Sequence, residues 1–122
     1  MEEFRYTGQV SNGVPDGYGT ADVYIFGLFW AGGFAGFWRK GYPEGYGIIK
    51  AADQGPLSGA YYKGDWLNGG MAGNNGIFKY PGGASYQGIF NQNGPLYGTI
   101  TYGNGDKWTG SNNLFSPCCF NT

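Results

Sequence analysis

Residues 34–47 read Phe34-Ala-Gly36-Phe-Trp38-Arg-Lys-Gly41-Tyr-Pro-Glu-Gly45-Tyr-Gly47. Aromatic residues and glycines alternate at two-residue spacing in the first half of this stretch, and glycines return in the second half. Residues i, i+2 and i+4 of a β-strand share one face, so we expect Phe34, Gly36 and Trp38 on the same side. A glycine there leaves room for a ring from a neighbouring strand, which a β-carbon would hold off. The stretch therefore predicts a strand with an aromatic face.

The same design occurs three more times, with one extra residue in the third copy and about one fewer in the fourth, and it begins once again near the end of the chain. The copies start at Tyr6, Phe34, Tyr62 and Tyr86, and a partial fifth copy starts at Trp108. These starting points are 22 to 28 residues apart. A period of this length is typical of a stacked array of structural repeats.

Each copy is predicted to be a β-hairpin. We expect the segment with glycines at spacings of four and two to be a turn, because glycine adopts the positive φ that other residues avoid. Pro15, Pro43 and Pro95 fall in these expected turns. Alternating apolar residues such as Ile49 and Phe78 then predict a return strand. The fold class is therefore all-β, a single antiparallel twisted meander of tandem β-hairpins that forms an open ribbon.

We expect residues 1–110 to form the array of about four repeats plus a partial fifth, and residues 111–122 to form a C-terminal capping tail. The tail contains the only two cysteines, Cys118 and Cys119, whose role the sequence leaves open. Two links between repeats are longer than the others, at residues 24–33 and 52–59. They are either longer hairpins or, for the apolar link at 24–33, a protruding lobe that contacts a partner.

Composition excludes several classes of function. The net charge is -1, from 7 basic and 8 acidic residues, and no basic run provides the electrostatic footprint of a nucleic-acid-binding protein. The absence of histidine removes the commonest general base and metal ligand. We therefore expect no enzyme, no metal site and no cofactor. The acidic start, Met1-Glu-Glu, lacks the features of a secretory signal and predicts a cytoplasmic location.

The pattern Tyr-x-Gly-x-aromatic-x-x-Gly-x-x-x-Gly-x-Gly closely resembles the MORN repeat (membrane occupation and recognition nexus). The resemblance covers roughly residues 4–110, and the segment from Gly98 to Gly110 is similar to the link between repeats of that family. The resemblance implies a β-hairpin ribbon with an aromatic-lined groove. It also implies a non-catalytic role in binding, scaffolding or dimerisation. Phosphoinositide binding, which has been proposed for the family, finds no basic cluster in this sequence.

Three functional hypotheses remain open. The first is a protein-interaction module, which binds a protein partner or a second copy of itself through the aromatic groove and the lobe at 24–33. The second is a small-ligand protein that stacks a nucleotide or sugar on its rings, and the third is a membrane-surface adaptor. The rings could alternatively serve mainly to pack the ribbon. The predicted binding residues are Tyr6, Phe29, Trp30, Phe34, Trp38, Tyr62, Trp66, Tyr86, Phe90 and Trp108.

Overall fold

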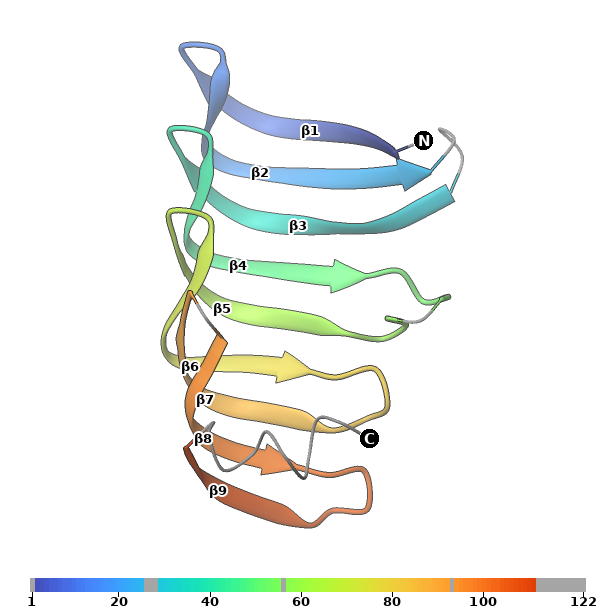
Figure 1. The fold of residues 1–122 in the computed structure, drawn as a ribbon. Helices are drawn as coiled ribbons and strands as arrows, with labels where there is room; N and C mark the ends of the chain where they lie inside the picture. Colours follow the sequence, from blue (N-terminus) through green and yellow to red (C-terminus); the bar gives the residue numbers. More distant parts are fainter. Residues whose placement is uncertain (1, 26–28, 56, 93, 112–122) are drawn as a thin grey trace.

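The protein is an open ribbon of nine antiparallel strands. The computed structural model describes residues 2–25, 29–55, 57–92 and 94–111. Each strand pairs with the next one along the chain, so the spatial order is β1 to β9 without a crossover (Figure 1). This confirms the predicted all-β meander of hairpins. The strands are β1 (Glu2–Ser11), β2 (Val14–Ile25), β3 (Phe29–Arg39), β4 (Tyr42–Ala51), β5 (Tyr61–Leu67), β6 (Gly70–Lys79), β7 (Ser85–Asn91), β8 (Gly94–Thr101) and β9 (Lys107–Ser111).

The turn inside each hairpin is shorter than the sequence pattern predicts. In the second copy it consists of Lys40 and Gly41, with φ of 51° and 90°, and β4 already begins at the next residue. Positive φ at both central residues is the signature of a type I′ turn, whose twist matches that of the flanking strands. Gly45, with φ of 97°, lies within β4, where the register of pairing with β3 shifts. The later glycines of the motif therefore build a bulged strand, and the prediction that they form the turn is wrong.

The prolines that we assigned to the turns also lie in strands. Pro43 is the second residue of β4 and pairs with Trp38, and Pro15 and Pro95 hold the second position of β2 and β8. A proline lacks the N–H but keeps its carbonyl, which remains free to accept a hydrogen bond. The amide of Gly41 donates to the carbonyl of Pro15 at 2.9 Å, and the amide of Gly69 donates to that of Pro43 at 3.0 Å. The turns of the second and third repeats are thus hydrogen-bonded to the preceding repeat.

The links between repeats lie along the opposite edge of the ribbon from these short turns (Figure 1). In the link at 24–33, Tyr24 pairs with Trp30 and the strands on both sides continue to the limits of the described residues. The structure therefore extends β2 and β3 into this link; residues 26–28 lie outside the described part. In the link at 52–59, the amide of Ala51 donates to the carbonyl of Ala60 at 2.9 Å and closes the loop.

One glycine from each strand lies in a row that crosses the whole ribbon. Paired residues include Gly19 with Gly36, Gly36 with Gly47, and Gly76 with Gly88. Between β5 and β6 the pairing is interrupted, yet a β-carbon on Gly64 would lie only 2.9 Å from the Cα of Gly76. The row consists of Gly8, Gly19, Gly36, Gly47, Gly64, Gly76, Gly88, Gly98 and Gly110.

Aromatic rings occupy the space that the missing β-carbons leave. A β-carbon on Gly76 would lie 2.6 Å from Cδ1 of Phe90 and 2.8 Å from Cε1 of Tyr62, closer than atoms can approach. Gly47 is covered in the same way by Phe34 of its own repeat and Trp66 of the next. The predicted arrangement of rings over glycines is confirmed, with one ring from each of two successive repeats.

The first repeat departs from this pattern at its edge. Val10 holds the position of Trp38 and Trp66 in the motif, but it is 62% exposed whereas both tryptophans are buried. The indole N–H of Trp38 donates to the carbonyl of Gly19 at 3.1 Å, which places this ring on the glycine of the preceding repeat. No repeat precedes Val10 within the described residues, so its side chain has no such glycine to cover.

We predict that replacing Gly76 by Ala lowers the free energy of unfolding by about 1–3 kcal/mol, because the new methyl group overpacks Phe90 and Tyr62. Gly82→Ala is the matched control, since nothing lies within 4 Å of a β-carbon at that exposed turn position. Urea unfolding followed by tryptophan fluorescence measures both variants. Equal stability of the two variants would contradict the role assigned to the glycine row.

The burial of Tyr80 leads us to a second prediction, which concerns the stability of the folded protein at alkaline pH. Tyr80 packs beside Phe78, with ring centres 4.7 Å apart, and burial raises its pKa to about 12, with a smaller contribution from Tyr86. The folded state therefore favours the neutral phenol. Stability from this group is fully present below the unfolded pKa of about 10 and is lost as the pH rises toward 12.

We expect the free energy of unfolding to fall between about pH 10 and pH 12 in the native protein. Tyr80→Phe should show a shallower fall, because phenylalanine has no phenol to ionise. Denaturant unfolding at a series of pH values measures both slopes. If the variant loses stability as steeply as the native protein, the assignment to Tyr80 is wrong.

Candidate functional site

A continuous series of aromatic rings runs along one face of the ribbon. Successive rings meet edge to face, with centres 4.8 to 5.3 Å apart, a geometry that favours the contact of a positive ring edge with a negative ring face. The series alternates between the first and the fifth residue of successive motif copies, such as Phe34 and Trp38 in the second copy. In spatial order the rings are Tyr6, Trp38, Phe34, Trp66, Tyr62, Phe90 and Tyr86.

Most of the predicted binding residues belong to this series, and packing covers nearly all of their surface. Six of them are at most 8% exposed: Phe34, Trp38, Tyr62, Trp66, Tyr86 and Phe90. Tyr6 is half-buried at one end, and Trp108 is 36% exposed in the last strand, where its ring covers Gly110. The rings therefore form the core of the sheet, and only their outer edges remain open to a partner.

The tyrosine hydroxyl groups also point back into the ribbon. The hydroxyl of Tyr62 donates toward the carbonyls of Asp65 and Ala72, at 2.9 and 3.1 Å, and that of Tyr86 donates to the carbonyl of Ile89 at 3.0 Å. Burial raises the pKa of both phenols. These groups satisfy strand carbonyls at the bulges, so they do not present a row of polar donors to the solvent.

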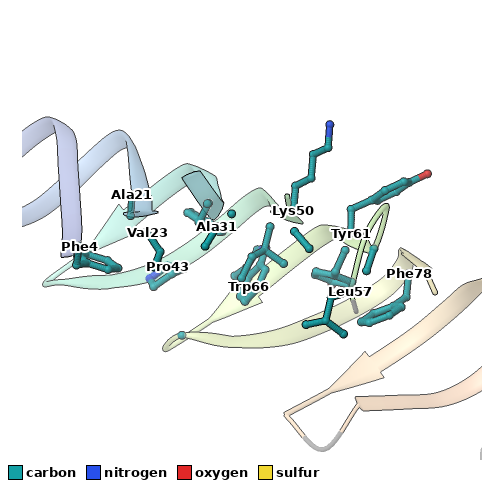
Figure 2. A pocket seen from close by; sticks show the side chains of 18 of the residues that line it. Phe4, Ala21, Val23, Ala31, Pro43, Lys50, Leu57, Tyr61, Trp66 and Phe78 are labelled. Carbon is teal, nitrogen blue, oxygen red and sulfur yellow. The ribbon is translucent and has the colours of Figure 1, made fainter. Parts of the chain in front are cut away.

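A groove of about 660 Å³ lies on the aromatic face over the first three repeats (Figure 2). The outer edges of four core rings contribute to its floor: Phe34, Trp38, Tyr62 and Trp66. Its walls include the more exposed side chains of Phe4, Ile49 and Leu57, at 66%, 44% and 63% exposure. The groove thus combines a rigid aromatic floor with accessible apolar walls.

The groove is almost free of charge. Among the described residues, Lys50 is the one charged residue that lines it, and its side chain extends away from the side where Trp66, Leu57 and Phe78 lie (Figure 2). The other contributors are small or apolar, such as Ala31 and Pro43. This chemistry suits an apolar group that enters from solvent.

The link at 24–33 contributes Ala31, Gly32 and Gly33 to the groove, but its predicted binding residue Trp30 lies outside it. Trp30 is 38% exposed and its indole N–H donates to Oδ1 of Asp22 at 2.9 Å, but it does not line the groove. Phe29 begins β3 and pairs through its backbone with Ile25, and its side chain is outside the described part. Cys118, Cys119 and the predicted capping tail also lie outside the described residues.

Sequence reasoning missed the walls of the groove. Ile49 had been placed on the apolar side of its return strand, which was a usable signal. Phe4 precedes the first motif copy, but it lies two residues before Tyr6 and therefore shares its face, which was a usable signal as well. Leu57 lies in a link, so no periodic pattern points to it.

Potential metal ligands are not clustered in the part of the chain that the structure describes. Within 2–25, 29–55, 57–92 and 94–111, no group of three acidic, cysteine or histidine residues lies close enough to share a metal ion. The same residues include no helix with the length and hydropathy to cross a membrane.

Comparison with known proteins agrees with the repeat structure. The family model described as the MORN repeat matches residues 6–21 and 34–55. Alsin from Homo sapiens and Alsin from Mus musculus are each 27% identical to this chain. Each alignment is 122 residues long and covers 98% of the chain. The chain spans about 6% of the length of those proteins. The two matched segments lie mainly in the first and second hairpins of the ribbon, which are therefore similar to MORN repeats.

Proposed function

We propose that this chain is a protein-interaction module whose groove over the first three repeats holds an apolar segment of a partner protein. The groove itself carries this proposal: it is an accessible apolar groove with a volume of about 660 Å³ and a single lysine among its described lining residues. MORN repeats are in general non-catalytic repeat modules, commonly used for protein or membrane interaction.

The walls of the groove favour a protein segment as the occupant. Phe4, Ile49 and Leu57 are exposed enough that covering them removes apolar surface from water, which drives association. The floor is rigid, because each ring contacts its neighbours edge to face. A rigid floor loses little conformational freedom when a partner binds.

A small ligand is the second candidate, and the size of the groove is what favours it. Pockets for small molecules commonly measure about 300–1,000 Å³. Such pockets also contain a few polar groups that fix the orientation of the ligand. In this groove the tyrosine hydroxyls donate to strand carbonyls and Lys50 points away, so a nucleotide or sugar would find few polar partners. A membrane-surface role finds less support still, since the groove has almost no positive charge.

Two adjacent isoleucines allow a matched test of the groove. Ile49 is 44% exposed and lines the groove, whereas Ile48 is 37% exposed and alternates to the opposite face of β4. Peptides selected from a random library against the native protein should be rich in apolar residues. We expect Ile49→Asp to weaken their binding about tenfold or more, because it places a charge in an apolar contact.

Ile48→Asp should leave this binding unchanged. Static light scattering on both variants reports whether a second copy of the chain is the partner. Selected peptides that bind Ile49→Asp as tightly as the native protein would refute the groove as the site. Displacement of the peptides by nucleotides or sugars at low concentration would favour the small-ligand candidate instead.

A further inference from the structure

The face opposite the aromatic rings gathers lysines that are far apart in the sequence. Lys50 of β4 pairs with Tyr61 of β5, which pairs with Lys79 of β6. The same register row continues through Ser85 and Thr101 to Lys107 of β9. Lys63 lies two residues along β5 from Tyr61, and therefore on the same face. The sequence has no run of basic residues that predicts this arrangement.

Three of these lysines surround one tyrosine. Neighbouring strands are about 4.8 Å apart, so the Cα atoms of Lys50 and Lys79 lie about 10 Å from each other, on either side of Tyr61. Nζ of Lys63 lies 5.5 Å from the centre of the Tyr61 ring, a cation–π contact. In Figure 2 the side chains of Lys50 and Tyr61 extend to the same side, away from the groove. We call Lys50, Lys63 and Lys79 the lysine cluster.

Few carboxylates on this face oppose the lysine cluster. Among the described residues the ion pairs are those of Arg5 with Glu3 and of Arg39 with Glu44, neither of which involves the cluster. Asp65 lies two residues beyond Lys63 on β5, beside Tyr46. Asp22 of β2 lies in the same register row as Lys50 of β4, but β3 separates the two residues. The cluster thus carries three positive charges that no ion pair of the described residues neutralises.

We propose that the lysine cluster binds an acidic segment of a protein partner. The proposal extends the proposed interaction role to the opposite face of the ribbon. In an extended segment, alternate side chains are about 7 Å apart on one side, a spacing comparable with the diagonal distance between neighbouring lysines of the cluster. Lysine meets carboxylates as a flexible point charge, so the match needs no fixed fork geometry.

A protein segment fits this surface better than an anionic bilayer. Recruitment to a bilayer usually takes four to eight clustered basic residues. The cluster has three, on a chain whose net charge is -1. A short acidic segment contacts only the cluster, whereas a flat bilayer would also approach the acidic residues of the ribbon.

The test uses a fluorescently labelled peptide of alternating glutamate and alanine, with a glutamine and alanine peptide as the neutral probe. We expect the acidic peptide to bind and the neutral one not to bind, with affinity that falls as salt is raised. The double variant Lys63→Glu and Lys79→Glu should weaken binding about tenfold or more, because like charges now face each other. Lys40→Glu, in a turn outside the cluster, is the matched control and should bind as the native protein does.

Vesicles of phosphatidylcholine with and without phosphatidylserine form the other arm of the experiment. Binding to the anionic vesicles without binding to the acidic peptide would overturn the proposal in favour of a membrane surface. Binding of the acidic peptide that the double variant retains would also overturn it. Ile49→Asp should leave acidic-peptide binding unchanged, so failure of the groove and failure of the lysine cluster can be told apart.

Discussion

The close approach of glycine backbones across nine strands is the constraint on which the rest of this structure depends. A β-carbon at Gly36 would lie 2.5 Å from the Cα of Gly47, so any side chain there would push the strands apart. The same row of glycines lets aromatic rings sit against the backbone itself. A single sheet has no second layer to cover its apolar face. Here the rings take that place, because each one covers glycines and contacts the rings beside it.

This arrangement makes the repeats depend on their neighbours. Tyr62 and Tyr86, which have repeats on both sides, are 1% and 0% exposed, whereas Val10 and Trp108 near the ends are 62% and 36% exposed. Stability in such arrays comes largely from contacts between adjacent units. Because the rings are committed to the core, the surfaces left for partners are the walls of the apolar groove and the opposite face of the ribbon. The two faces differ in chemistry, one apolar and the other rich in lysine.

The strands and the buried face could be predicted from the sequence, because two-residue alternation of aromatic residues and glycines has one simple geometric solution. The bulges could not. The third copy has one more residue between Gly73 and Gly76 than the second copy has between Gly45 and Gly47, and we could not tell from the sequence where it would go. The structure places it in the bulge of β6 and keeps the two-residue turn at Asn68 and Gly69. Hydrogen bonding across the sheet fixes the turn, while glycines at positive φ let the bulge absorb the extra residue.

The candidate sites were harder to predict, because they depend on contacts between repeats and on the register of the strands. The aromatic positions could be identified, but their burial depends on rings from adjacent repeats that the spacing alone does not place. The lysine cluster depends on the register of three strands, and a one-residue slip in any of them would move a lysine to the other face.

Proton–proton nuclear Overhauser effects from the glycine α-protons test the central claim most directly, since they report distances between backbone and rings in solution. The structure predicts cross-peaks from Gly47 to the rings of Phe34 and Trp66, and from Gly76 to the rings of Tyr62 and Phe90. Gly82 should show no such cross-peaks. A well-dispersed spectrum in which the glycines of the row lack contacts to these rings would contradict the account.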